Sequence, residues 1–263
     1  MAGSSVPAAF QPVGASRLHE GVVRQIVAGI VGGDIQPGDP LPTEHALAAQ
    51  FGVSRTVIRE AVRVLVGKGL VAVKHGSGMQ AQPADRWNSL DPLILFEQIR
   101  RGRDETVLRE VLELRRVVEV EIAALASRRR TSDDLRALRA AVEGMRAVLD
   151  DPTAYTRLDI AFHEAILAAG RNRLLVQALR PAGQALAVGR LISSRRPGGP
   201  AESERGHESI LVAIEAADEE GARVAMRRHI VQFEDDVRAS LAAGLAGDVA
   251  DLADFATIAH TVG

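Results

Sequence analysis

The fold is decided by the stretch Val53-Ser54-Arg55-Thr56-Val57-Ile58-Arg59-Glu60-Ala61-Val62-Arg63-Val64-Leu65. At 3.6 residues per turn its apolar face consists of Val57, Ala61, Val62 and Leu65. The polar side chains on the other face are Arg55, Thr56, Arg59 and Arg63. Ser54 is a good helix N-cap, so the helix begins where its polar face begins. A short helix of this kind suits a DNA major groove, although a solvated surface helix would show the same pattern.

The segments before this helix predict a helix-turn-helix. An apolar stripe of Leu18, Val22, Ile26 and Ile30 predicts a first helix that ends at Gly32-Gly33. A proline-rich connection follows, and Thr43 can cap a second helix over Glu44–Gln50, with Leu47 and Phe51 facing inward. Gly52 then provides the tight turn into the helix that Ser54 opens.

The segments after this helix predict a β-wing. Gly67 and Gly69 close the helix, and residues 70–73 and 79–81 have the composition of two short strands. Between them lies the glycine-rich tip Lys74-His75-Gly76-Ser77-Gly78. Three helices followed by such a hairpin make a winged helix-turn-helix.

Composition limits the remaining choices. The 263 residues carry a net charge of −2, but residues 1–83 have seven Lys/Arg against five Asp/Glu, so the basic charge lies in the first part of the chain. There are no cysteines, which excludes disulfides, thiolate metal sites and cysteine nucleophiles. No apolar run approaches the ~20 residues of a membrane span, and no signal peptide is recognisable. We therefore expect a cytoplasmic protein that does not engage a membrane.

The N-terminal motifs resemble the DNA-binding domain of GntR-type transcriptional regulators. The segments that carry this resemblance are Leu41-Pro42-Thr43-Glu44, Leu47-Ala48, residues 51–61, Leu65, Gly69-Leu70 and His75-Gly76-Ser77-Gly78. The resemblance implies operator contacts by Ser54, Arg55, Thr56 and Arg59 on the recognition helix, and by His75 and Gly76 at the wing tip. The family usually has an arginine where this chain has His45. A neutral imidazole cannot make a bidentate contact, so we expect base preference or affinity to change there.

Beyond a linker at residues 83–91, almost everything is predicted to be helical. The predicted helices are Leu93–Arg101, Thr106–Arg130, Ser132–Leu149, Thr153–Ala169, Asn172–Ser194, Ala201–Ala217 and Glu219–Ala243. Residues such as Gly102, Pro152, Gly170 and Asp218 explain the stops and starts. The fold class is therefore mainly α, with a winged helix-turn-helix followed by an all-α antiparallel bundle. We place flexible tails at 1–14 and 245–263, the DNA-binding domain at 15–82, and the bundle at 92–244.

The predicted bundle contains a candidate metal site. Asp159 and His163 are four residues apart on one helix, so they share a face. His207 and His229 lie on two later helices at a spacing that suits an antiparallel pair. An aspartate and three histidines that converge form a nitrogen and oxygen site for a divalent transition metal. Any one of these histidines alone is more often a surface or core residue.

A second resemblance supports that site. Residues 88–243 resemble the FCD ligand-binding domain of the FadR subgroup, whose metal site is one aspartate and three histidines. The resemblance implies metal binding by Asp159, His163, His207 and His229, with zinc favoured and nickel, manganese or iron as alternatives. It also implies that Arg115 pairs with an effector carboxylate, and it suggests Asn172 as a further effector contact.

These observations predict a ligand-responsive regulator. A homodimer would bind a pseudo-palindromic operator in double-stranded DNA. A small carboxylate effector, such as a sugar acid or hydroxy acid, would bind beside the metal and release the protein from the operator. We favour repression over activation. Two alternatives remain open at this point: a helical metalloenzyme in which the Asp/His₃ site activates water, and a DNA-binding protein whose metal is purely structural.

Overall fold

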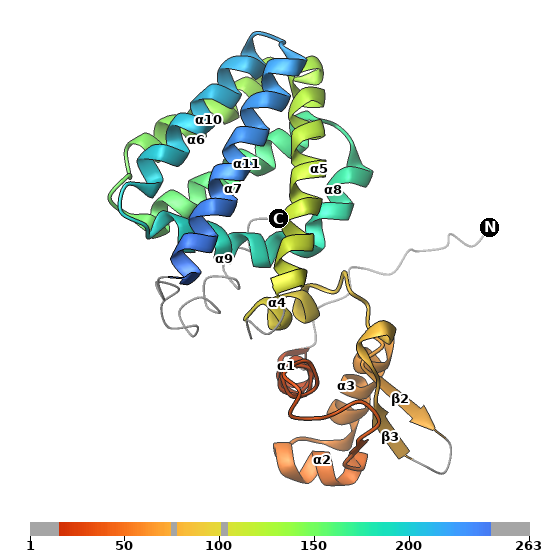
Figure 1. The fold of residues 1–263 in the computed structure, drawn as a ribbon. Helices are drawn as coiled ribbons and strands as arrows, with labels where there is room; N and C mark the ends of the chain where they lie inside the picture. Colours follow the sequence, from red (N-terminus) through yellow and green to blue (C-terminus); the bar gives the residue numbers. More distant parts are fainter. Residues whose placement is uncertain (1–15, 75–77, 101–104, 243–263) are drawn as a thin grey trace, which may run out of the picture. The chain divides into compact units, whose positions relative to one another are not determined.

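The computed structural model describes residues 16–74, 78–100 and 105–242. Figure 1 labels its α-helices and the strands β2 and β3. The helices and strands run, in chain order, α1 Ser16–Val31, β1 Pro40–Leu41, α2 Glu44–Phe51, α3 Arg55–Gly67, β2 Val71–Lys74, β3 Gly78–Ala81, the 3₁₀ turn η1 Ala84–Arg86, α4 Pro92–Arg100, α5 Glu105–Arg129, α6 Ser132–Arg146, α7 Pro152–Ala169, α8 Arg173–Leu179, the 3₁₀ turn η2 Arg180–Ala182, α9 Gly183–Ser194, α10 Gly199–Glu215 and α11 Glu219–Ala242. The mainly α fold class is confirmed.

The recognition helix α3 forms for the predicted reasons, with one correction to its buried face. Ser54 caps it by accepting a hydrogen bond from the Val57 N–H at 3.4 Å. The buried residues are Ile58, Ala61, Val62 and Leu65. Val57 was predicted to face inward but is only partly buried. Ile58 continues the i, i+3, i+4, i+7 spacing of the stripe, whereas Val57 lies about 100° away from it.

The remaining N-terminal elements enclose one apolar core. Thr43 caps α2 through the Ala46 N–H, and Gly52 ends it in a left-handed conformation with φ +66°. On α1 the stripe of Val22, Ile26 and Ile30 is buried, but Leu18 is 58% exposed, against expectation. Val22, Ile26 and Ile30 belong to the same buried cluster as the apolar residues of α3, and this cluster holds the recognition helix in place.

The sheet has one strand more than predicted. Its order is β1-β3-β2 and both pairings are antiparallel, with Val73 opposite Met79 and Leu41 opposite Met79 on the other side. β1 is only two residues long and begins with Pro40, which is tolerated because the strand lies at an edge. The predicted wing tip, with His75 and Gly76, falls outside the described residues, so those two contacts stay predictions.

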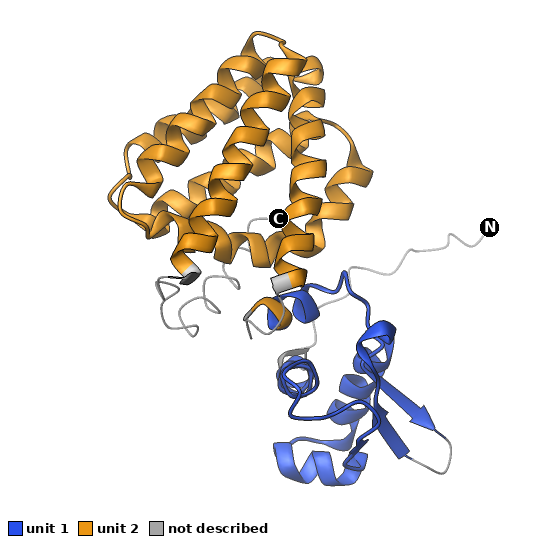
Figure 2. Cartoon of the chain, viewed as in Figure 1, with its two compact units in different colours: residues 1–97 blue, residues 98–263 orange. Residues whose placement is uncertain are grey.

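The segment predicted as a linker packs on the N-terminal unit. The Trp87 indole lies against its core and donates to the Gln82 carbonyl at 2.9 Å, and Lys68 forms an ion pair with Asp91. Gly69 has φ +76°, and a Cβ there would lie 2.1 Å from the carbonyl oxygen of Arg86. The two compact units divide after Glu97, inside α4 (Figure 2).

The second unit is a helical bundle. α11 packs against α5 and α10, while α7 packs against α5, α6 and α9. The prediction of a single helix over residues 172–194 is wrong, because the 3₁₀ turn η2 separates α8 from α9. Pro181 explains the break, since it has no N–H to donate and its ring crowds the preceding turn. The predicted terminal tails lie outside the described residues. Within the described residues, no helix is both long and apolar enough to cross a bilayer.

Candidate functional site

The polar face of α3 presents the predicted DNA contacts to solvent. Arg55, Thr56 and Arg59 are exposed in the first turn and a half of the helix. Ser54 is also exposed, and its hydroxyl is engaged as the N-cap. The side chains that would enter a major groove therefore project from a helix whose other face is fixed in the core.

His45 lies in the first turn of α2 and contacts this face. Its Nδ1 is 3.0 Å from Nη2 of Arg55, and both side chains are exposed. The neighbouring Glu44 lies 3.9 Å from Nε of Arg59 through its Oε2. Sequence reasoning placed His45 among the DNA contacts but did not anticipate its hydrogen bond to Arg55.

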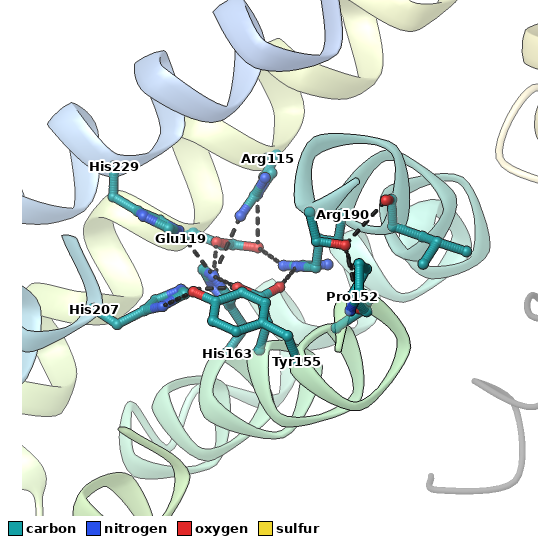
Figure 3. A network of polar contacts seen from close by, with 12 residues as sticks. Arg115, Glu119, Pro152, Tyr155, His163, Arg190, His207 and His229 are labelled. Atoms are coloured by element: carbon teal, nitrogen blue, oxygen red, sulfur yellow. Dashed lines mark hydrogen bonds and ion pairs between the residues drawn. The ribbon is translucent and has the colours of Figure 1, made fainter. Parts of the chain in front are cut away.

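In the second unit the structure brings the four predicted metal ligands together. Asp159 and His163 come from α7, His207 from α10 and His229 from α11, and all four are buried. One candidate ligand atom from each residue lies within 4.8 Å of the others. Figure 3 shows the three imidazoles converging from their separate helices.

The distances within this cluster fit a transition metal. Nε2 of His163 lies 3.3 Å from Nε2 of His229, and Nε2 of His207 lies 2.8 Å from Oδ1 of Asp159. Ligand atoms about 2.0–2.1 Å from a zinc ion would lie roughly 3–4 Å apart, so the cluster needs little adjustment to hold one. Although it is buried, Nε2 of His207 makes no well-directed hydrogen bond to any residue that the structure describes. A buried nitrogen without a well-directed hydrogen bond suits metal coordination better than a closed hydrogen-bond network.

A glycine makes room for one of these ligands. A Cβ at Gly206 would lie 2.8 Å from Nδ1 of His229 and 3.4 Å from its Cγ. Real side chains do not approach so closely, so α10 can pass the His229 ring only because residue 206 has no side chain.

Sequence reasoning missed two charged residues around the cluster, Glu119 and Arg190. Oε2 of Glu119 lies 2.8 Å from Nδ1 of His163, and its Oε1 lies 3.4 Å from Nη2 of Arg190. Nε of Arg190 lies 2.7 Å from Oδ2 of Asp159. Glu119 and Arg190 therefore contact the far sides of two candidate ligands and fix which atoms face the centre. Arg190 is the lone charge in the apolar segment Ala185–Ser193, a signal that could have identified it.

Burial and these neighbours set the protonation of the cluster. Burial lowers the pKa of His163 to about 4, and burial together with the other histidines lowers the pKa of His229 well below 6.5. Burial alone would raise the pKa of Asp159, but the close contact with the His207 imidazole and the charge of Arg190 bring it well below 3.8. At neutral pH, His163 and His229 are thus uncharged and Asp159 is ionised, which is the state in which such groups bind metal.

The two predicted effector residues have different surroundings. Arg115 is fully buried, pairs with Glu119 at 3.2 Å, reaches Nε2 of His163 at 3.4 Å and stacks over Phe233 at 4.2 Å. Its Nη1 has no hydrogen-bond partner among the residues that the structure describes. Asn172 instead caps α8, where its Oδ1 accepts from the Leu175 N–H at 3.3 Å. That capping role explains Asn172 without an effector.

A cavity opens beside the cluster. It is small, with room for about one water molecule, and part of it is open to solvent. The lining residues are Tyr155, Asp159, Arg190, Ser193, Ser194, Gly199, Ser203, His229 and Phe233. Hydroxyl groups and a guanidinium thus line the space next to two candidate metal ligands, and these groups are hydrogen-bond donors of the kind that bind an anion.

A winged helix-turn-helix followed by a helical bundle with a buried polar site is the architecture of a DNA-binding transcriptional regulator. Residues 18–80 match the gntR family of bacterial regulatory proteins, and residues 110–232 match the FCD domain. The chain is 30% identical to the Mycobacterium tuberculosis HTH-type transcriptional regulator Mce2R over 82% of this chain and 90% of that protein. The chain therefore belongs to the gntR family and is a transcriptional regulator. Its domains and relatives are those of regulators, not enzymes, which removes the metalloenzyme alternative.

Two further comparisons are informative. The Galactonate operon transcriptional repressor of Escherichia coli is 37% identical over 56% of this chain, a stretch that spans 65% of that protein. A solved structure described as Lar, which controls the expression of the Listeria monocytogenes agr system, covers 88% of this chain and 99% of its own, with 17% identity and a TM-score of 0.55. The structural likeness concerns the fold alone.

Proposed function

We propose that this regulator is controlled by a small carboxylate that binds beside a divalent transition metal. Asp159, His163, His207 and His229 would hold the ion, with zinc favoured and nickel, manganese or iron as alternatives. The observation that carries this proposal is the convergence of four buried donor atoms within 4.8 Å, in a unit separate from the DNA-reading face. The bound ion would supply a Lewis-acidic attachment point for an effector oxygen.

The chain's own residues would perform the recognition. Arg115, whose Nη1 has no hydrogen-bond partner in the described part of the chain, would donate to the effector carboxylate. Glu119 and Arg190 would keep His163 and Asp159 oriented. The hydroxyl groups that line the cavity favour a hydroxylated carboxylate, which would enter only after the lining side chains move apart. The name of the E. coli galactonate repressor supports a sugar acid and a repressing role.

Operator release would follow from coupling between the two units. In a homodimer, two copies of α3 would read a pseudo-palindromic site through Ser54, Arg55, Thr56 and Arg59, with the wing-tip residues His75 and Gly76 beside them. If the effector weakens DNA binding, then operator DNA must weaken effector binding by the same factor. Equal effector affinity with and without operator would contradict this coupling.

The first test is elemental analysis of the purified protein, followed by a thermal-shift screen of hydroxy acids and sugar acids, galactonate included. An effector at 100 times its dissociation constant should add about 2.7 kcal/mol to the free energy of unfolding. His229→Ala should lose both bound metal and the effector shift while DNA binding without effector persists. His19→Ala, a histidine on α1, is the matched control and should keep both.

The same experiment separates a purely structural metal from a sensing one. A structural ion would lower the melting temperature on chelation but leave the response to effector unchanged. Full metal content in His229→Ala would remove that residue from the ligand set.

A further inference from the structure

The first turn of α2 faces the side chains with which α3 would read DNA. Nδ1 of His45 lies 3.0 Å from Nη2 of Arg55. Next to it, Oε2 of Glu44 lies 3.9 Å from Nε of Arg59. Two adjacent residues of α2 therefore each contact one arginine of α3, and the two arginines are one helical turn apart.

The chemistry of the closer contact is defined by the guanidinium. Arginine has only donors, so Nδ1 of His45 must accept and the proton of this imidazole lies on Nε2. The bond uses one of the five N–H groups of Arg55, and the remaining four allow a bidentate contact with guanine. A guanidinium already held by a hydrogen bond also loses less side-chain freedom when DNA arrives.

The backbone fixes the position of His45 relative to Arg55. Thr43 caps the start of α2, and the left-handed turn at Gly52 sets how α2 meets α3. Leu47 and Ile58, on the inner faces of the two helices, are buried in one core. His45 is thus presented to Arg55 by two helices fixed against each other, although its own side chain is exposed.

We propose that His45 is a positioning residue that orients Arg55 and thereby sets the base preference of the recognition helix. This inference rests on the proposed base contact of Arg55. Glu44 holds Arg59 less firmly, because its contact is long and solvent-exposed, so its effect is smaller.

The test is selection of binding sites from a randomised double-stranded DNA library, which requires no known operator. The proteins compared are the full-length wild type, His45→Ala, His45→Asn, Arg55→Ala and the control Gln50→Ala on the exposed side of α2. We expect His45→Ala to lose base preference at the same positions as Arg55→Ala, by about fivefold, against roughly 5- to 150-fold for a complete arginine–guanine contact. His45→Asn should restore the preference, since Oδ1 of asparagine can occupy the place of Nδ1. Gln50→Ala should match the wild type.

A double-mutant cycle on the selected duplex gives the second readout. If His45 acts through Arg55, the His45→Ala substitution should have no further effect on binding in the Arg55→Ala background. A loss of preference at positions that Arg55→Ala leaves unchanged, or an undiminished effect in that background, would mean that His45 contacts DNA itself and would overturn the inference. A wild-type preference in His45→Ala would overturn it as well. If Arg55→Ala selects the wild-type sites, the proposed role of Arg55 fails instead.

Discussion

Replacing Glu119 with glutamine is the most demanding test of the buried network in the second unit. The Glu119 side chain is 3% exposed and contacts Arg115 at 3.2 Å, His163 at 2.8 Å and Arg190 at 3.4 Å. Glutamine keeps the shape and one carbonyl oxygen but removes the negative charge. Arg190 would then keep its contact with Asp159, whereas Arg115 would lose its contact with the Glu119 carboxylate.

The expected loss of stability is large. Leaving one side of a buried ion pair without its partner costs about 3–5 kcal/mol. For a chain of this size each kcal/mol moves the melting temperature by about 2–4 °C, so the second unit should melt roughly 6–20 °C lower. The pKa of Glu119 points the same way. Burial raises it, but Arg115, His163 and Arg190 together bring it below 4.5, so the ionised form is the one that stabilises the fold.

The assay is calorimetric unfolding of the chelator-treated protein at neutral pH, followed by a zinc titration. We expect zinc to bind about 10- to 100-fold more weakly to Glu119→Gln, because the carboxylate that orients His163 is lost. Glu113→Gln, on the exposed face of the same helix, is the matched control and should stay within about 0.5 kcal/mol of the wild type. A Glu119→Gln protein as stable as that control would refute the reasoning.

Three further predictions concern other parts of the chain. Gly206→Ala should weaken metal binding at least tenfold, because its Cβ would lie 2.8 Å from Nδ1 of His229 and push that ring away; a metal titration measures this. Stability of the metal-free protein should be complete above about pH 6.5 and fall toward pH 4, because burial holds the pKa of His163 near 4 while the unfolded chain takes up its proton. That loss should reach about 3 kcal/mol in denaturant unfolding at a series of pH values. Gly69→Ala should cost more than about 3 kcal/mol and abolish DNA binding without affecting metal content, since its Cβ would lie 2.1 Å from the Arg86 carbonyl at φ +76°.

Each of these has a contrary outcome. Gly183→Ala has open space around its Cβ and is the control for Gly206→Ala. If both alanines raise stability by about 1 kcal/mol and leave zinc affinity unchanged, the packing argument for Gly206 fails. Stability that is flat between pH 6.5 and 4 would contradict a buried neutral His163. Normal DNA binding by Gly69→Ala would show that the contact with residue 86 is dispensable.

Sequence reasoning located most elements because their ends have local causes. Ser54 and Thr43 accept hydrogen bonds from N–H groups three residues later, and such caps are visible without any tertiary information. The four candidate ligands were found because their residue types are rare in apolar helices and two share a helical face. The match to a known domain pattern supplied the rest.

What sequence reasoning missed was decided by packing. Glu119 has the same polar character as the exposed residues of α5, and only the helices packed around it make it buried. Val57 and Ile58 are both apolar, so the sequence could not decide which of the two is buried without the orientation of α3. β1 exists only because Pro40 and Leu41 meet Gln80 and Met79 from a distant part of the chain. The break at Pro181, in contrast, had a local cause that was overlooked.

The candidate ligands also matter for the integrity of the chain. Asp159 and His163 precede the turn between α9 and α10, whereas His207 and His229 follow it. A bound ion would therefore act as a reversible cross-link between residues 159 and 229 of the folded chain, and it would stabilise the fold by its binding free energy, because a site assembled from three helices does not exist in the unfolded chain. A protease cut in that turn would leave two fragments still joined through the ion, and a chelator would remove that link.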